Sequence, residues 1–538
     1  MVMALETAAL VAAKDLSVAP PDRDASFTPA GLAALIASIR ERLEVIEDPV
    51  KRRIGLARED TTPAGCRVIG QLAPIYPEWL GDRRFGEAHG CRFPYVVGEM
   101  ARALATPAMV VASAKAGFCG FYGAAGLDLD TIRAAVREIG HATEGLPWGT
   151  NLIHSPNEPD LERATVELYL GEGVRRISAS AFMAMTPNVV HYSYRGAHTD
   201  STGRIVRPNQ ILAKVSRPEV AAQFMAPPPK EMLESLLRDG RLTPAEARIA
   251  QYVPVAEDVT AEADSGGHTD NRPLAVLLPL LEAERDRAAA RLRGVPAVRV
   301  GAAGGLGNPA AVAAAFAMGA AYVLTGTINQ TTRESGLSET ARRMLVDAGM
   351  ADVTMAPSAD MFELGVKVQV LRKGSMYAQK AGRLFELYRS YASIDEIPPS
   401  VRQGIERDIF GRDLGKVEID VEKFFSARKP DELRRAAQDG RHKMALIFRW
   451  YLGMSSRWPI TGQKDRQLDY QIWCGPAIGA FNEWARGSFL EDLESRSVTQ
   501  VGLNLLEGAA IATRAQQARV HGIDVPASLF NPRPRRLA

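Results

Sequence analysis

The stretch V-R-V-G-A-A-G-G-L-G, Val298–Gly307, ends a short apolar run in a glycine-rich turn, and Y-V-L-T-G-T, Tyr322–Thr327, repeats that design further along the chain. The segment between them, Asn308–Gly319, is rich in alanine and predicts a helix. The order is therefore strand, turn, helix, strand, turn, with glycine at the end of each strand. Glycine lets the backbone approach a ligand closely, and a phosphate bound between the last two strand–helix turns is typical of a (β/α)8 barrel. The two turns predict such a barrel, with a phosphorylated cofactor at this place in it.

Eight short apolar runs have the length and composition of buried parallel strands, and helix-prone segments lie between most of them. The runs are Tyr95–Gly98, Phe118–Tyr122, Gly149–His154, Arg176–Ser180, Gln210–Val215, Val259–Ala263, Val298–Ala302 and Tyr322–Thr325. The helix-prone segments are Asp130–Gly140, Pro159–Gly171, Arg272–Leu292 and Pro309–Gly319. Eight runs joined in this way favour a closed barrel over an open doubly wound sheet. We therefore expect an α/β fold, a (β/α)8 TIM barrel.

Segments before, inside and after the barrel interrupt this alternation. A helical period with Thr28 as N-cap predicts a helix over Thr28–Arg53. The polar and aromatic stretch Thr186–Asn209 predicts a long loop, and the segment after the next strand contains a capping box at Thr243 and Glu246. Because both segments follow barrel strands, we expect an inserted lid at the mouth of the barrel. After the barrel, Met361–Ser393 predicts a long helix.

The domains that we expect follow from these patterns. They are a leader and helix over 1–60, an irregular strand and loop region over 61–92, the barrel over 93–360 with its insertion at about 186–256, and a helical C-terminal extension over 361–538.

Composition narrows the class of protein. The 538 residues are 46% hydrophobic and 24% charged with a formal net charge of +2, which is typical of a soluble globular chain and does not indicate a nucleic-acid-binding or membrane-binding surface. No run of about 18 apolar residues predicts a spanning helix, and the N-terminal stretch lacks the basic residues of a signal peptide. The four cysteines have no C-x-x-C spacing, so we expect no zinc site, no redox pair and no other metal. These features predict a cytoplasmic protein.

The loop E-A-D-S-G-G-H, Glu262–His268, follows the sixth apolar run and is the strongest candidate for chemistry. Its two glycines leave room for a ligand, and a histidine exchanges protons near neutral pH. His268 is therefore a candidate proton donor, with a loop histidine of no chemical role as the alternative. For the glycines of the phosphate-type turns, the alternative is a tight turn that needs a positive φ.

Two polar residues stand near the ends of otherwise apolar strands, Asn151 in W-G-T-N-L-I and Lys214 in I-L-A-K-V-S. A lysine ammonium is costly to bury without a partner, so Lys214 is expected to face a ligand or an acid in the barrel mouth. A buried Lys–Asp pair without a ligand is the alternative for Lys214. Capping of the backbone at the strand end is the alternative for Asn151.

The order of these motifs resembles the flavin-dependent barrels of the nitronate monooxygenases and the FMN-type bacterial enoyl-acyl-carrier-protein reductases. The barrel motifs that carry the resemblance are Gly98–Ala101, Ala114–Gly123, Trp148–Ile153, Glu262–Asp270 and the two glycine-rich turns. The chain is more similar still to the PfaD family, the stand-alone enoyl reductases of polyunsaturated fatty acid synthases and trans-acyltransferase polyketide synthases. That resemblance runs from about Gly70 to Gly508 and includes tail motifs that the smaller flavin barrels lack: Phe362–Gly374, Arg449–Trp458 and Asp469–Asn482. One departure is Asp264, an extra residue relative to the shortest E-A-G-G-H form of the loop.

The resemblance implies an enoyl reductase that reduces the 2,3 double bond of an acyl-carrier-protein-bound enoyl chain. It would use NADPH or NADH through FMN and act in trans in polyunsaturated fatty acid or polyketide biosynthesis. His268 and Lys214 are the implied catalytic residues, the first as a candidate acid and the second as a stabiliser of negative charge. The implied FMN-binding residues are Gly98, Glu99, Met100, Ala101, Asn151, Lys214, Glu262, Gly266, Gly267, Gly304, Gly305, Gly326 and Thr327. The alternatives are an FMN oxidase of the nitronate monooxygenase type and a non-catalytic scaffold of a synthase.

The implied partners are acyl-carrier-protein domains, which are usually acidic. Basic residues beside the predicted mouth loops are therefore candidate docking residues: Arg195, Arg204, Arg207 and Lys230. Simple solvation of a long loop is the alternative for them. The aromatic-rich segment 441–484 is expected to pack against the barrel or against a second copy of the chain, and we expect a homodimer.

Overall fold

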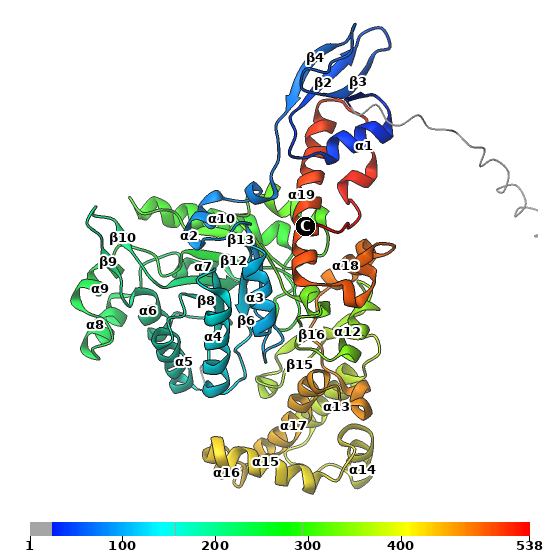
Figure 1. The fold of residues 1–538 in the computed structure, drawn as a ribbon. Coiled ribbons are helices and arrows are strands. Elements are labelled where there is room, and N and C mark those ends of the chain that lie inside the picture. The colour runs from blue at the N-terminus through cyan, green and yellow to red at the C-terminus, as the bar shows by residue number, and fades with distance from the viewer. Residues whose placement is uncertain (1–23, 156–157, 293) are drawn as a thin grey trace, which may run out of the picture. The chain divides into compact units, whose positions relative to one another are not determined.

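The computed structural model describes residues 24–155, 158–292 and 294–538. The chain forms two compact units, one of Met1–Tyr76 with Ala510–Pro532 and one of Pro77–Ala509 with Arg533–Ala538. The leader predicted at the start of 1–60 falls on residues 1–23, outside the described residues. Each unit has its own architecture, and the larger one contains the barrel (Figure 1).

In the smaller unit, four antiparallel strands form a sheet with the order β1-β3-β2-β4. Its elements are β1 (Ala25–Ser26), α1 (Pro29–Ala37), β2 (Leu43–Asp48), β3 (Arg53–Arg58) and β4 (Arg67–Leu72). Thr28 is the N-cap of α1 as predicted, but the helix predicted over Thr28–Arg53 is wrong beyond Ala37. The buried Arg514 donates to the carbonyls of Ser38, Glu41 and Ala73 at 2.6–2.8 Å, so these groups are satisfied without a longer helix.

The larger unit contains a closed barrel of eight parallel strands in the order β11-β12-β13-β14-β5-β6-β7-β8. The strands are β5 (Tyr95–Val97), β6 (Cys119–Tyr122), β7 (Trp148–Ile153), β8 (Arg176–Ser180), β11 (Gln210–Val215), β12 (Asp258–Glu262), β13 (Arg299–Ala303) and β14 (Val323–Thr325). Each of the eight predicted runs matches one of these strands to within about one residue at either end. The predicted TIM barrel is therefore confirmed.

Helices separate the barrel strands along the chain. They are α3 (Pro107–Lys115), α4 (Leu129–Thr143), α5 (Pro159–Gly171), α6 (Pro187–Tyr194), α7 (Pro218–Phe224), α10 (Leu274–Arg291) and α11 (Pro309–Ala317), while the short 3-10 helix η2 (Thr327–Thr331) follows β14. Five of these α-helices begin with proline, which has no N–H to leave unpaired at the first helical position.

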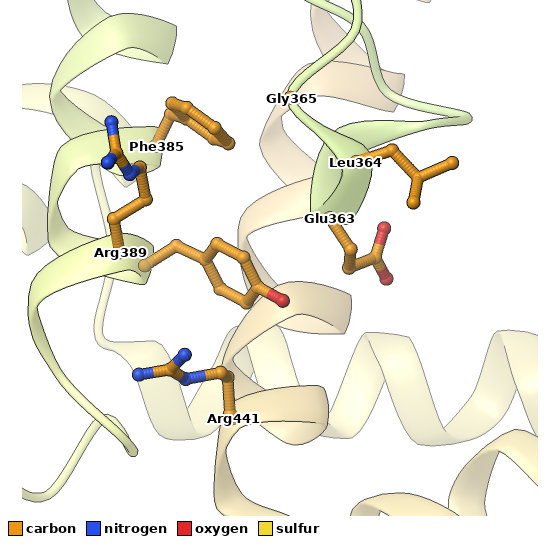
Figure 2. Close-up of a pocket in the computed structure, with 7 residues that line it drawn as sticks. Glu363, Leu364, Gly365, Phe385, Arg389 and Arg441 are labelled. Atoms are coloured by element: carbon orange, nitrogen blue, oxygen red, sulfur yellow. The ribbon is translucent and has the colours of Figure 1, made fainter.

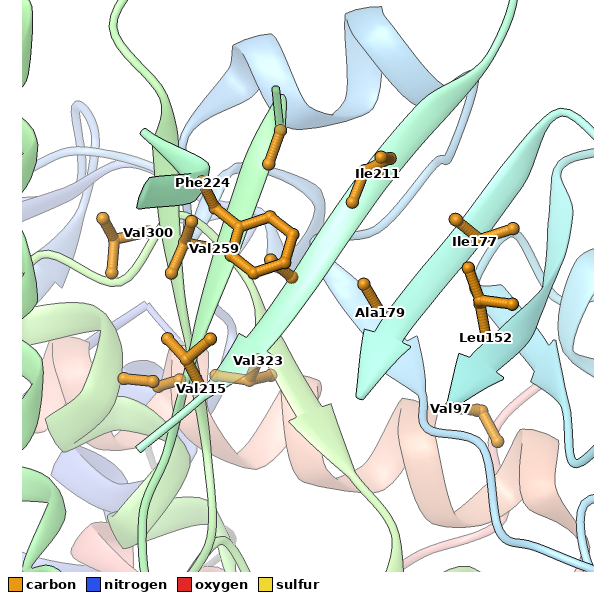
Figure 3. Packing of buried hydrophobic residues seen from close by; sticks show 14 of the residues in the cluster. Val97, Leu152, Ile177, Ala179, Ile211, Val215, Phe224, Val259, Val300 and Val323 are labelled. Carbon is orange, nitrogen blue, oxygen red and sulfur yellow. The ribbon is translucent and has the colours of Figure 1, made fainter. Parts of the chain in front are cut away.

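Alternate residues of each strand face opposite sides of the barrel wall. One set packs between the strands and the surrounding helices; Figure 3 shows Val97, Ile177, Ile211, Val259 and Val323 of this set. A separate apolar cluster includes the residues of the other set, among them Val96, Phe121, Leu212 and Leu324, together with Phe85 of α2 (Arg83–His89). Both clusters are contiguous and buried, so the barrel interior is a packed core and not a pore.

A buried ionic cluster lies at the amino-terminal end of the barrel. His89 places Nε2 2.7 Å from Oδ2 of Asp258, and Arg299 donates to both oxygens of that carboxylate at 2.7 Å. Burial alone would raise the pKa of Asp258, but Arg299 and His89 outweigh it and lower the pKa to about 2. The carboxylate of Asp258 is therefore balanced by Arg299 and His89 of the same chain.

The segment inserted at about 186–256 does not cover the barrel mouth. Its predicted long loop contains α6 and the hairpin of β9 (His198–Thr199) with β10 (Ile205–Val206), and α8 (Lys230–Arg238) and α9 (Pro244–Ala250) follow α7. Arg207 pairs with Glu257 and donates to the carbonyls of Pro254 and Val255, immediately before β12 begins. The hairpin follows α6, and α8 and α9 follow α7, and each of these two barrel helices, α6 and α7, has already returned the chain to the amino-terminal ends of the strands. The insertion therefore lies at the opposite end of the barrel from the mouth, and the predicted lid position is wrong. The capping box at Thr243 and Glu246 is confirmed.

Residues 337–478 build a second apolar core, whereas the buried residues 481–509 belong to the core of the barrel. β15 (Val353–Pro357) and β16 (Lys367–Leu371) form an antiparallel hairpin, and α12 (Glu339–Val346) precedes it. The later helices are α13 (Tyr377–Ser390), α14 (Pro399–Ile405), α15 (Leu414–Arg428), α16 (Pro430–Ala436), α17 (Gly440–Thr461), α18 (Ala477–Ala485) and α19 (Val498–Val520). The helix predicted over Met361–Ser393 is wrong before Tyr377, because K-V-Q-V-L at Lys367–Leu371 alternates with the period of a strand and pairs with β15.

Candidate active site at the carboxyl end of the barrel

The predicted site residues gather at one end of the barrel. Because all eight strands are parallel, their carboxyl ends share one mouth. The positions follow from the strand bounds: Gly98–Ala101 come after β5, Asn151 lies in β7, Lys214 in β11, Glu262 ends β12, Gly304 and Gly305 follow β13, and Gly326 and Thr327 follow β14. The barrel thus brings together residues that are far apart in the sequence.

Lys214 is at the centre of an ionic network in the mouth. Its Nζ lies 3.0 Å from Oε1 of Glu99 and 3.2 Å from Oε1 of Glu262, and Ser180 at the end of β8 donates to Oε1 of Glu99 at 2.6 Å. Burial alone would lower the pKa of Lys214, but the two carboxylates outweigh it and raise that pKa. Burial alone would raise the pKa of Glu99, but Lys214 and Ser180 lower it. Lys214 therefore holds its proton at neutral pH and acts as a fixed positive charge.

Polar atoms in the mouth are buried without a partner among the described residues. They are Oε2 of Glu99, Oγ of Ser178 and Oγ of Ser265. Ser178 is the register partner of Asn151 across β7 and β8, and Asn151 accepts the N–H of Ala125 through Oδ1 at 3.2 Å. Asn151 therefore caps the backbone of a neighbouring loop, as its alternative predicted, while its Nδ2 makes no hydrogen bond to any described residue. A buried polar atom is costly without a partner, so this set indicates a polar ligand.

The turn after β5 is shaped by its backbone. A Cβ on Gly98 would come within 2.6 Å of Leu324, so close packing explains this glycine. The carbonyls of Met100 and Ala101 accept the N–H groups of Ala105 and Leu104 at 3.2 Å. The turn therefore presents the side chain of Glu99 to Lys214.

The loop that contains His268 is held by the C-terminal part of the chain. Gly267 exchanges two backbone hydrogen bonds with Gln369 of β16, at 3.0 and 2.7 Å. A Cβ on Gly266 would come within 2.7 Å of the backbone of Cys474, and one on Gly267 within 2.6 Å of the Trp473 ring. Asp264, the extra residue of the loop, accepts from the side chains of Asn271 and Gln369 at 2.8 Å. Tight packing therefore requires both glycines of the loop.

His268 is oriented by two residues from outside the barrel. Its Nε2 lies 3.2 Å from Oδ2 of Asp360, in the loop between β15 and β16, and the edge of its ring meets Trp473 with 5.6 Å between ring centroids. Burial alone would raise the pKa of Asp360, but His268 and Ser358 outweigh it and lower that pKa to about 2. Since Asp360 engages Nε2, Nδ1 is the nitrogen of His268 that remains for a reacting group.

The glycine-rich turns after β13 and β14 leave space at the predicted phosphate position. Gly304 and Gly305 have φ of +90° and +73°. A Cβ on Gly304 would collide with Ala263, whereas one on Gly305 or Gly326 would meet nothing within 4 Å. Thr327 accepts the N–H of Gly475 at 3.2 Å and fixes the second turn. The tight-turn explanation accounts for the positive φ of both Gly304 and Gly305. Gly326 has no positive φ, so open space and not a tight turn distinguishes the second turn.

Strained backbone also marks the mouth. Arg102 and Ala103 after β5, Ala181 after β8 and Asn271 after β12 have φ between +50° and +61° although none is glycine. Such conformations cost of order 1 kcal/mol each and cluster at binding and catalytic sites.

Comparison with known proteins shows the family of this chain. The model of the family described as nitronate monooxygenase matches residues 85–381, more than half of the chain. The chain belongs to the nitronate monooxygenase family. A second family model, the inserted helical domain of [acyl-carrier-protein] S-malonyltransferase, matches residues 391–470.

The chain is also similar to proteins of two biosynthetic systems. A polyunsaturated fatty acid synthase protein of Thraustochytrium sp. is 45% identical over 448 residues, which are 82% of this chain and 30% of that protein. Polyketide biosynthesis protein ThaF of Burkholderia thailandensis is 45% identical over 438 residues, 80% of this chain and 37% of that protein. The chain therefore spans about a third of these two relatives.

Among solved structures, the enoyl reductase domain of MlnA from the macrolactin biosynthesis cluster of Bacillus amyloliquefaciens is 34% identical with a TM-score of 0.79. The matched region covers 82% of this chain and 99% of the MlnA domain. Together these relatives confirm the resemblance to the PfaD family.

Sequence reasoning missed the residues that support the site from a distance. Asp360, Gln369 and Trp473 lie far along the chain from His268, and Ser180 was read only as the end of a strand. The available signals were two motifs of the tail resemblance, Phe362–Gly374, which contains Gln369, and Asp469–Asn482, which contains Trp473. The expectation that the aromatic segment 441–484 packs against the barrel is confirmed at Trp473.

Other expectations concern metals, membranes and docking. Within the described ranges, no group of three His, Cys, Asp or Glu side chains could hold a metal, and no helix is long and apolar enough to cross a membrane. Arg207 is engaged with Glu257, Arg195 lies 3.7 Å from Glu246, and both lie in the insertion away from the mouth. The predicted docking role beside the mouth is therefore wrong for these arginines.

Proposed function

We propose that the protein is an FMN-dependent enoyl reductase. It reduces the 2,3 double bond of an enoyl thioester carried by an acyl-carrier protein, with NADPH or NADH as the reductant, in polyunsaturated fatty acid or polyketide biosynthesis. The family match and the 34% identity to the MlnA enoyl reductase domain over nearly all of that domain support the reaction. The observation that carries the proposal is the buried cation of Lys214 at the carboxyl ends of the strands, with His268 held by Asp360 after β12 and open space beside Gly305 and Gly326 after the next two strands.

The residues of the mouth fit a flavin mononucleotide. The open space beside Gly305 and Gly326 suits a phosphate, since no side chain fills it. The unpartnered Oε2 of Glu99 and the free Nδ2 of Asn151 are an acceptor and a donor for the polar edge of a flavin ring. When bound, FMN would supply the hydride transfer from the nicotinamide to the β-carbon of the enoyl substrate.

The chain's own residues supply charge and a proton. Lys214 stays protonated between Glu99 and Glu262, so it offers a fixed positive charge to electron-rich groups that develop beside it. Asp360 holds the Nε2–H of His268 and leaves Nδ1 toward the substrate, so the imidazolium form would donate its Nδ1 proton to the α-carbon and become the neutral tautomer with Nε2–H toward Asp360. Asp360 is a positioning residue in this scheme, because it acts through the imidazole.

Two further features support a carrier-bound substrate. Residues 391–470 match a helical domain that is named for a carrier-protein acyltransferase. Lys429 of this region lies 2.9 Å from Glu158, in the loop between β7 and α5, so the helical region reaches the rim of the barrel mouth. A homodimer remains our proposal for the assembly.

The test is the absorption spectrum of the purified protein, followed by steady-state assays. We expect bound flavin and oxidation of NADPH or NADH that depends on a crotonyl thioester. A flavoprotein that instead oxidises nitronates and leaves crotonyl thioesters intact would belong to the alternative class of FMN oxidases. Purified protein that neither contains nor takes up flavin would favour the non-catalytic scaffold.

A further inference from the structure

A pocket of about 370 Å³ lies outside the barrel, between α13, the start of α17 and the loop that joins β15 to β16 (Figure 2). Its lining residues are Glu363, Leu364, Gly365, Phe385, Tyr388, Arg389 and Arg441. In Figure 2, Phe385 and Arg389 come from one helix and Arg441 from another, while Glu363 and Leu364 come from a separate turn and their side chains point away from the two arginines. Three separate segments therefore build this pocket.

The two arginines of the pocket have no counter-ion among the described residues. Neither Arg389 nor Arg441 forms an ion pair with any of these residues, and both are exposed. Arg441 places its guanidinium carbon 5.8 Å from the centre of the Tyr388 ring. Glu363, the carboxylate of the lining, is already paired with Arg449 at 3.1 Å. The pocket is thus left with two positive charges that its own lining does not neutralise.

The loop that lines the pocket also serves the candidate active site. Asp360 in this loop holds His268, and Glu363–Gly365 line the pocket a few residues later. Leu364 follows Asp360 by four positions in the sequence, so their Cα atoms lie at most about 14 Å apart. One wall of the pocket therefore belongs to the same short loop as the residue that holds His268.

We propose that this pocket binds the phosphate of the pantetheine arm that carries the substrate thioester. The proposal rests on the proposed function, because it assigns a subsite to the same substrate. A phosphate matches two unpaired guanidiniums, since arginine forms bidentate, charge-assisted hydrogen bonds to phosphate oxygens. Phe385 and Tyr388 offer apolar contact to the hydrocarbon part of the arm, which in this proposal runs from the pocket along the loop that contains Asp360 to the mouth.

Paired substrates test the pocket. Crotonyl-phosphopantetheine and crotonyl-pantetheine differ only in the phosphate, so the ratio of their KM values isolates that group. In the flavin-loaded wild-type protein we expect a KM at least about tenfold lower for the phosphorylated substrate. The double variant Arg389→Gln/Arg441→Gln should lose this preference while keeping the KM for crotonyl-pantetheine and the kcat for both. The control Arg407→Gln/Arg434→Gln removes the same charge from the helical region outside the pocket and should keep the preference.

A binding measurement makes the inference independent of turnover. Phosphopantetheine has no reducible double bond, and calorimetry should find it bound by the wild-type protein and at least about tenfold weaker by the double variant. Equal KM values for the two thioesters in the wild-type protein, or phosphopantetheine binding that the double substitution leaves unchanged, would overturn the proposal. Binding that behaves as expected without reduction of either thioester would instead contradict the proposed function alone.

The same phosphate occurs in coenzyme A and in a carrier protein, and a second pair of substrates separates them. We expect the double substitution to raise the KM of a crotonyl carrier protein, whose arm has no adenine nucleotide to add contacts, at least as much as that of crotonyl coenzyme A. An increase for coenzyme A alone would contradict a pocket that serves the carrier-bound substrate.

Discussion

The substitution Lys214→Met removes the cation between Glu99 and Glu262 and keeps a side chain of similar length. At 3.0 and 3.2 Å, each contact corresponds to about 5 kcal/mol of attraction at an effective dielectric constant of about 20, before the cost of desolvating the lysine. Because that cost offsets much of the attraction, and because the variant leaves Glu99 buried without a cation, we expect the free energy of unfolding to fall by about 3–5 kcal/mol near neutral pH. Urea unfolding of the full chain measures this loss. Lys230→Met is the control, since Lys230 is exposed and its partner Glu234 is 3.6 Å away on the same helix.

The pH dependence of the loss identifies its cause. In the wild-type protein the pKa of Glu99 is lowered, so its stabilising contribution is present above the ordinary value of 4.5 and is lost as the pH falls below it. In the variant, burial without Lys214 raises the pKa of Glu99, so the folded variant takes up a proton and gains stability as the pH falls from neutral toward that ordinary value. The deficit should therefore narrow on acidification, by up to about 1.4 kcal/mol per pH unit. The double variant Lys214→Met/Glu99→Gln should recover part of the loss. A deficit as small as that of Lys230→Met, or one that does not change with pH, would refute the coupled network.

Three further predictions follow from the mouth and the opposite end of the barrel. Gly305→Asp should abolish flavin binding, because it places a carboxylate in the open space of the turn. The control Gly305→Ala has the same positive-φ strain of about 1 kcal/mol and should retain flavin. Equal flavin content in the two variants would contradict the predicted position of the phosphate. His268→Ala should leave flavin reduction by NADPH nearly unchanged and lower the rate of enoyl reduction by about 10²–10⁴-fold, and Asp360→Asn should lower that rate less. Stopped-flow assays measure the two half-reactions separately. Equal losses in the two half-reactions would exclude the acid role of His268. Because the pKa of Asp258 is lowered to about 2, the charged carboxylate stabilises the fold by about 2 kcal/mol above its ordinary pKa, and this stabilisation is lost as the pH falls from about 4 to 2. The difference in free energy of unfolding between the wild-type protein and Asp258→Asn should therefore shrink in this range. A difference that stays constant would mean that Asp258 is not charged in the fold.

The barrel was predictable because its signal is local. Each strand is a short apolar run such as Ile211–Val215, and each run ends at glycine, a polar residue or the start of a helix. Errors occurred where a distant partner decides the structure. The predicted helix over Thr28–Arg53 ends early where Arg514 takes up the carbonyls, and the predicted lid lies at the amino-terminal edge where Arg207 meets Glu257.

The candidate site divides in the same way. Lys214 and Glu262 lie at the carboxyl ends of strands, so topology alone places them in the mouth, while His268 lies in the loop that follows Glu262. The tail motifs contain Gln369 and Trp473, but no local pattern shows that these residues contact the His268 loop. Asp360 and Trp473 reach His268 only because the β15–β16 hairpin and the chain after α17 pack on the Gly266–Gly267 turn, and their sequence spacing contains no trace of that contact.

An anaerobic single turnover tests the central claim most directly. The purified protein is titrated with NADPH until its flavin absorbance is bleached, freed of excess nucleotide, and mixed with an equimolar crotonyl thioester. We expect the flavin absorbance to return and mass spectrometry to find one butyryl thioester for each flavin reoxidised. Flavin that stays reduced in the presence of the crotonyl thioester, and is reoxidised only when oxygen is admitted, would contradict an enoyl reductase.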